Sequence, residues 1–201
     1  MYVLLPGNML KNTTSIFIEC LEEWGVPRKI ISVKNRNSNY FNKSTINGKK
    51  DGAFFRIIIY AQFNTINNNE LKWIWDFNLI FFPENPNEIN LSITSETLGN
   101  KLGKLFGKWD LEIYEDSFDK AFYIQSNHKY AHVETLDQSI QKKLLRQIII
   151  SPTFIIKGKQ IRCKINFNPY DLQGHKTNIL DLLDIGFELS KNIDNWQPPK
   201  P

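Results

Sequence analysis

Two segments of the chain alternate strictly between apolar and polar side chains, the pattern of strands that bury one face. In segment 51–63 the apolar face consists of Phe55, Ile57, Ile59, Ala61 and Phe63. In segment 70–82 it consists of Leu71, Trp73, Trp75, Phe77, Leu79 and Phe81. The short polar linker NTINNN joins the two segments. The pattern therefore predicts an antiparallel hairpin whose aromatic face lies under helices.

Three other segments repeat apolar residues at helical spacing. The first predicted helix spans about 15–24 and ends at Gly25. A second begins with Thr135 and Gln138 as a capping box. Its inner stripe would be Leu136, Ile140, Leu144 and Ile148. The third spans about 178–193, with an inner face of Ile179, Leu182, Leu183, Gly186, Leu189 and Ile193. We expect its acidic residues, which include Asp181 and Asp184, to face solvent as solubilising charge.

Shorter strands complete the predicted pattern. They are expected at 28–35, 89–94, 111–115 and 121–126, with a hairpin over 153–167 that turns at Lys157 and Gly158. The polar stretch 35–50 is interpreted as a loop or a loose hairpin that ends in an Asp51-Gly52 turn. This order predicts an α+β fold: a largely antiparallel, mixed sheet with helices packed on it.

We expect a single domain over 1–195, followed by a tail at 196–201. Its N-terminal helix-and-sheet part would span 1–95, and its C-terminal sheet-and-helix part 96–195. The chain has 201 residues, of which 41% are hydrophobic and 23% charged, so it can bury a core without disulfides. Its two cysteines, Cys20 and Cys163, lie in apolar segments and form no zinc-binding pair. With no signal peptide or spanning helix recognised, we expect a cytoplasmic protein.

Segment 107–127 reads GKWDLEIYEDSFDKAFYIQSN and contains an acidic residue followed by a Phe-Asp-x-x-Phe element. The matching residues are Asp116, Phe118, Asp119 and Phe122. With the Thr-capped helix, the Gly158 hairpin and the Leu-rich final helix, residues 51–193 resemble a widespread bacterial domain family of unknown activity. Members of that family are often the soluble part of predicted membrane proteins, although this chain shows no membrane helix. No activity is established for that family, so the resemblance assigns no catalytic residues.

His128 and His132 form one candidate metal site, because residues four apart share a helical face. The glutamate of the H-E-x-x-H motif is missing, so a third ligand would have to come from Asp116, Asp119, Glu134 or His175. The alternative is that both histidines face water while Ala131 and Val133 point inward. A metal-dependent hydrolase is therefore our weakest hypothesis.

Asp116 and Asp119 have a structural interpretation. A short acidic side chain in a turn commonly accepts hydrogen bonds from backbone N–H groups. We expect these two residues to fix how the following strand enters the sheet.

Segment 96–109 separates three residue types onto three helical faces. Lys101, Lys104 and Lys108 lie on one face, next to an apolar face that includes Trp109. One interpretation is a helix clamped over the sheet. The other is that these four residues contact an anionic membrane surface or an acidic partner.

The sequence lacks the common nucleophile and phosphate-binding motifs, so we expect no enzyme and no cofactor. Arg56 and Lys72 are single cations among apolar strand residues, and Ile58, Ile74 and Ile80 occupy the opposite faces. We therefore expect a sheet covered on both sides and no specific binding of nucleic acid. The leading hypothesis is a non-enzymatic module that binds a protein partner in a bacterial system. A peripheral membrane domain is the alternative.

Overall fold

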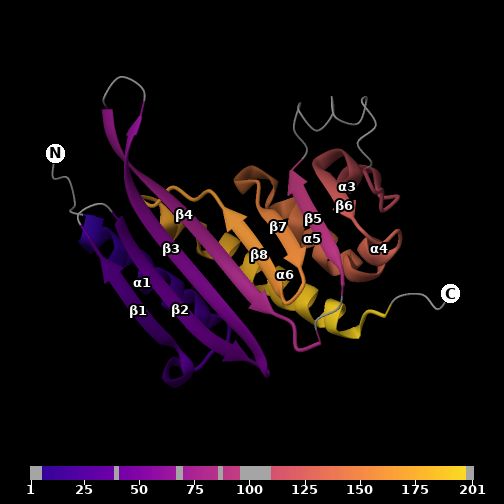
Figure 1. The fold of residues 1–201 in the computed structure, drawn as a ribbon, viewed down its shortest axis with the longest axis horizontal. Coiled ribbons are helices and arrows are strands. Elements are labelled where there is room, and N and C mark those ends of the chain that lie inside the picture. Colours follow the sequence, from indigo (N-terminus) through magenta and orange to yellow (C-terminus); the bar gives the residue numbers. More distant parts are fainter. Residues whose placement is uncertain (1–5, 39–40, 67–69, 86–87, 96–109, 198–201) are drawn as a thin grey trace.

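The computed structural model describes residues 6–38, 41–66, 70–85, 88–95 and 110–197. Eight strands form one sheet in the order β1-β2-β3-β4-β8-β7-β5-β6 (Figure 1). They are β1 (Ser32–Asn37), β2 (Phe41–Lys50), β3 (Ala53–Ile66), β4 (Glu70–Phe82), β5 (Asn90–Ser95), β6 (Phe122–Ser126), β7 (Thr153–Lys157) and β8 (Gln160–Ile165). All neighbouring strands are antiparallel. The predicted α+β class is confirmed.

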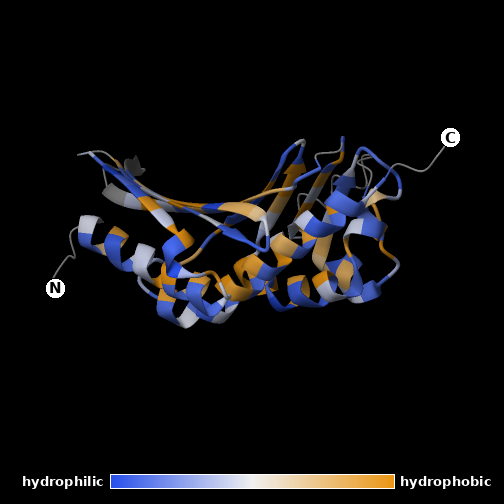
Figure 2. Ribbon diagram, turned by 90° about the horizontal axis from the view of Figure 1, so that it is seen from below, coloured by the Kyte–Doolittle hydropathy of each residue, from blue (hydrophilic) through white to orange (hydrophobic). Residues whose placement is uncertain are grey.

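The helices lie on one side of this sheet (Figure 2). They are α1 (Pro6–Glu23), α3 (Asp116–Ala121), α4 (Ala131–Thr135), α5 (Gln138–Arg146) and α6 (Lys176–Asn195). Short 3₁₀ turns occupy Arg28–Ile30, Ile148–Ile150 and Leu172–His175. Helix α1 packs on β2 and β3, and α6 packs on β4 and β8.

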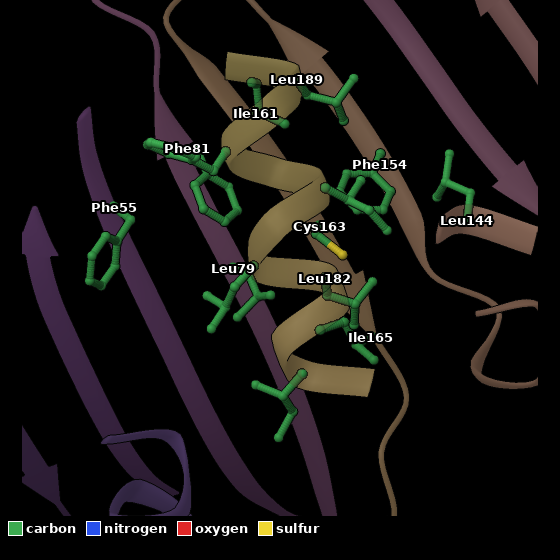
Figure 3. Close-up of a cluster of buried hydrophobic side chains, with 14 of the residues drawn as sticks. Phe55, Leu79, Phe81, Leu144, Phe154, Ile161, Cys163, Ile165, Leu182 and Leu189 are labelled. Carbon is green, nitrogen blue, oxygen red and sulfur yellow. The ribbon is translucent and has the colours of Figure 1, made fainter. Parts of the chain in front are cut away.

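The core fills the space between the sheet and the two long helices. Leu182 and Leu189 of α6 point toward a layer of strand side chains, all of them buried (Figure 3). That layer includes Leu79, Phe81, Phe154, Ile161, Cys163 and Ile165. The predicted inner face of α6 is confirmed, because all six of its residues are buried. The alternation predicted for β3 and β4 is confirmed for Phe55, Ile57, Ile59, Ala61, Phe77, Leu79 and Phe81.

Ion pairs join α5 to the acidic side of α6. The Lys143 Nζ lies 2.6 Å from Glu188 Oε1 and 3.6 Å from Asp184 Oδ2. Arg146 Nη2 lies 3.0 Å from Asp181 Oδ1. The expectation that Asp181 and Asp184 are merely solubilising was therefore wrong, since both carboxylates fix one helix against the next.

Asp184 also contacts Trp24, and Trp24 in turn contacts Lys50. The indole nitrogen of Trp24 donates to Asp184 Oδ1 at 2.6 Å. Lys50 Nζ donates to the Trp24 carbonyl and lies 3.9 Å from the centre of its ring. Burial lowers the pKa of the Lys50 ammonium.

Several sequence-based element boundaries were wrong for local reasons. Helix α1 begins at Pro6, about two and a half turns before the predicted start, in keeping with the preference of proline for the first helical turn. Residues 41–50 form strand β2, which pairs antiparallel with β1, so the hairpin alternative for 35–50 is confirmed and the loop alternative is wrong. No strand covers 111–115, where Leu111 contributes a single backbone hydrogen bond to Ile124.

The start of α5 also differs from the prediction. Asp137, and not Thr135, caps the helix by accepting a hydrogen bond from the Ile140 N–H at 3.0 Å. Thr135 instead donates to the Ala131 carbonyl in α4. Ile148 lies beyond the end of α5 and is 43% exposed, so it does not belong to the inner stripe.

Candidate functional site

No helix in the described ranges covers the side of the sheet that faces away from α1 and α6, and many side chains on that side are exposed. Strand register shows which side chains share it, because residues directly opposite each other in paired strands point to the same face. We call this surface the open face. The expectation of a sheet covered on both sides was wrong for the part of the chain that the structure describes: Phe54, Ile74 and Ile155 are each at least 40% exposed there.

The open face is strongly basic. Eight cations project from its described strand residues: Lys34, Arg36, Lys43, Lys49, Arg56, Lys157, Arg162 and Lys164. Asp76 is the one carboxylate among the strand residues whose side chains are described on this face. It lies 3.5 Å from Lys164.

Charge is therefore segregated within the molecule. The whole chain has 25 basic and 21 acidic residues. Among the side chains that the structure describes, 20 are basic and 19 are acidic, and those outside the open face comprise 12 basic and 18 acidic residues. A net charge of only +4 for the whole chain conceals a basic face, because the described side chains outside that face are acidic overall.

Aromatic side chains lie among these cations and hold some of them in place. Phe54 and Phe82 pack edge to face with ring centres 6.5 Å apart. Lys49 Nζ lies 5.1 Å from the Phe54 ring centre, and the Arg56 guanidinium lies 5.6 Å from that of Phe82. Arg56 Nε also donates to Asn47 Oδ1 at 2.8 Å. These contacts orient the guanidinium of Arg56 before any ligand binds.

One transverse row of the open face crosses all eight strands. Each member pairs directly with the next in the order Gln125, Ser92, Ile155, Arg162, Ile80, Arg56, Asn47 and Ser32. We call this set the central row. In this row Arg56 lies on one side of Ile80 and Arg162 on the other, and polar side chains occupy both ends.

Shallow hollows line the same surface. One of about 350 Å³ lies over β5, β6 and β7, and its lining includes Ser92, Gln125, Ile155 and Lys157. A second, of about 220 Å³, shares Ile155 and Lys157 with the first and adds Arg162. A third, also about 220 Å³, lies beside Phe54 and Lys49 at the other end of the sheet. The open face thus combines cations, exposed apolar residues and room for side chains.

Sequence reasoning missed this surface except for Arg56, which it dismissed as a single cation. The signal was present in 160–165, where Gln160, Arg162 and Lys164 alternate with buried residues. A one-sided strand of that kind indicates an exposed sheet face. The cations come from five strands, so only the register brings them together.

The predicted turn residues lie away from the open face. Asp119 accepts hydrogen bonds from the backbone N–H groups of Ile113, at 3.0 Å, and Glu115, at 3.2 Å. Asp116 is exposed and lies 3.6 Å from Lys120. The cap of α3 is Glu115, whose carboxylate accepts from the Phe118 N–H at 2.8 Å. These bonds lower the pKa of the Glu115 carboxyl, with the hydrogen bond from Ser117 contributing most.

The two histidines occupy different surroundings. His132 is 4% exposed, and its Nε2 lies 3.2 Å from the Glu112 carbonyl. The ring of His128 packs against Trp196 with centres 5.1 Å apart. The expectation that His132 faces water while Val133 points inward was wrong, since Val133 is 45% exposed. Within the described ranges, no three His, Cys, Asp or Glu side chains are grouped to hold a metal ion.

The remaining predicted site, formed by Lys101, Lys104, Lys108 and Trp109, lies outside the described residues. No helix in the described ranges is long and apolar enough to cross a membrane.

Comparison with known proteins gives little further information. No protein-family model and no curated protein matches the chain. Among solved structures, the chain is similar to the mycobacterial trehalose monomycolate transport factor A, TtfA. The identity is 8%, the TM-score is 0.49, and the match covers 94% of this chain and 98% of the other. A likeness at this level carries no functional conclusion.

Proposed function

We propose that the protein is a non-enzymatic, cytoplasmic binding module that docks an acidic protein partner on its open face. The observation that carries this proposal is the segregation of eight cations and one carboxylate on a sheet face that no described helix covers. A one-sided cluster of charge attracts partners of opposite sign and orients them before contact.

The apolar content of the open face favours a polypeptide partner. Ile74 and Ile155 are 40% and 46% exposed between the cations. A polypeptide can present carboxylates and apolar side chains together, whereas a phosphate backbone presents charge alone. The aromatic rings of this face also pack against each other, as Phe41 does on Tyr60 with centres 5.8 Å apart. Paired rings offer less surface for the stacking of free bases.

The shape of the sheet favours a narrow partner over a lipid bilayer. The sheet bends away from the helix layer at both ends, so the open face lies on the inside of the bend (Figure 2). A flat bilayer would meet only the rims of such a surface. An extended protein segment can instead lie along it and contact the cations at its centre.

A binding comparison tests the proposal. The probes are a short acidic peptide of Glu, Pro and Leu, vesicles containing phosphatidylglycerol, and single-stranded DNA. We expect the peptide to bind, and its affinity to fall as salt rises from about 50 to about 500 mM. The double variant Arg56→Glu with Arg162→Glu should bind it at least about tenfold more weakly.

The matched control keeps the same net charge but changes the helix side. Lys11 of α1 and Lys142 of α5 are exposed, so Lys11→Glu with Lys142→Glu should leave peptide affinity within about twofold. Equal losses in both double variants would show a general charge effect and refute the proposal. Vesicles or DNA bound more tightly than the peptide would replace it with a membrane or nucleic-acid function.

A further inference from the structure

We propose that the central row recognises an acidic segment in polyproline II conformation, lying across the strands with two carboxylates three residues apart on Arg56 and Arg162. This inference rests on the proposed function and adds the conformation and spacing of the ligand. It follows from the register of the sheet.

The strand register fixes the separation between the Cα atoms of the two arginines. Arg162 of β8 pairs directly with Ile80 of β4, and Ile80 pairs directly with Arg56 of β3. Neighbouring strands lie about 4.8 Å apart, so two strand steps place the arginine Cα atoms about 10 Å apart. The side chain of Ile80 lies between them and is 5% exposed, so it does not project beyond the arginines.

This separation matches one turn of polyproline II helix. The helix has three residues per turn and rises about 3.1 Å per residue, so residues i and i+3 point the same way about 9 Å apart. In a β-strand, residues i and i+2 share a face at only about 7 Å. Each guanidinium can bind a carboxylate through two parallel hydrogen bonds.

The ends of the central row supply a second argument for an extended ligand. A polyproline II segment makes no internal hydrogen bonds, so its backbone groups need outside partners. Ser92 and Gln125 lie at one end of the row, and Asn47 and Ser32 at the other. An α-helix bonds its own backbone and would make no use of these side chains.

Ile155 extends the site beyond Arg162. It pairs directly with Arg162, is 46% exposed and lines two adjoining hollows. We therefore expect an apolar ligand residue on this side of the second carboxylate. The resulting preference is for a proline-rich segment with two acidic residues three apart and an apolar residue nearby.

A spacing series tests the inference. Proline-based peptides of equal length and charge carry two Glu residues two, three or four positions apart, and their affinities are measured by fluorescence anisotropy. We expect the spacing of three to bind about threefold to fivefold more tightly than the others. Arg56→Gln and Arg162→Gln should each remove this preference, while Lys142→Gln should retain it.

The outcomes separate the inference from the function on which it rests. Equal, salt-sensitive affinity for all spacings would overturn the inference and leave acidic binding to the open face intact. A preference that survives in both arginine variants would also overturn it. So would tighter binding of a helical peptide with Glu residues seven apart, which lie about 10 Å apart on one helical face. Failure of every acidic peptide, including the Glu, Pro and Leu probe, would overturn both.

Discussion

Gly186 of α6 offers a direct test of how the helix layer packs on the sheet. This glycine is buried against the ring of Phe81, which is itself 2% exposed. A Cβ atom at Gly186 would overlap three ring carbons of Phe81. Non-bonded carbons normally approach to about 3.5–4.0 Å, so either the ring or the helix would have to move.

The magnitude of a Gly186→Ala change combines two opposing effects. Overpacking a tight core costs about 1–3 kcal/mol, and we take the upper end because Phe81 has no free space to enter. Replacing a glycine inside a helix with alanine stabilises the helix by about 1 kcal/mol. We therefore expect the free energy of unfolding to fall by about 2 kcal/mol. For a chain of this size, that lowers Tm by about 4–8 °C.

Urea unfolding followed by circular dichroism measures this change. Gly7→Ala in α1 is the matched control, because a Cβ atom there meets nothing within 4 Å. That variant should be within about 0.5 kcal/mol of the parent or slightly more stable. A Gly186→Ala protein as stable as the parent would show that α6 does not approach the sheet as closely as described.

Three further predictions concern charge, thiols and the α3 turn. Lys143→Met should destabilise the fold by about 1–3 kcal/mol, since it leaves Asp184 and Glu188 without their cation. Burial opposes the charge on Lys143, but these carboxylates raise its pKa above 10.5. The loss should therefore be full at pH 7–9 and fade as pH rises above about 10.5 in urea titrations. Burial raises the pKa of Cys20 to about 11 and that of Cys163 well above its usual value. Neither thiol should react with Ellman's reagent at pH 8 until the protein is unfolded; rapid reaction of the native protein would contradict their burial. Asp119→Ala should cost about 1–2 kcal/mol by removing the acceptor of two backbone N–H groups, whereas Asp116→Ala should change stability by less than about 0.5 kcal/mol. Equal effects of the two substitutions on urea unfolding would refute this distinction.

The sequence predicted elements whose apolar residues follow a clear period. Strands β3 and β4 and helix α6 were found because each buries a continuous apolar face. Strand β2 was predicted only as part of a loop or a loose hairpin, because its buried face contains Asn42, Ser44, Ile46 and Gly48, which do not form an apolar pattern. The paired strand β3 requires a glycine at position 48, because a Cβ atom there would overlap the ring of Phe55. This requirement follows from the strand pairing and not from the local sequence.

The open face could not be predicted for a different reason. Arg56 and Arg162 are far apart in sequence, and neither strand shows locally that its arginine lies near the other. They become near neighbours because β4 and β8 pair at the centre of the sheet. Such long-range pairing sets which single residues share a row, and no local pattern contains that information.

The most direct test of the open face as a binding surface is a nuclear magnetic resonance titration of ¹⁵N-labelled protein with the Glu, Pro and Leu peptide. We expect the largest shift changes at the side-chain Nε–H groups of Arg56 and Arg162 and at backbone amides of β3, β4, β7 and β8. Helices α1 and α5 should change little. Shift changes concentrated on the helices, with both arginine signals unmoved at saturating peptide, would contradict the proposal.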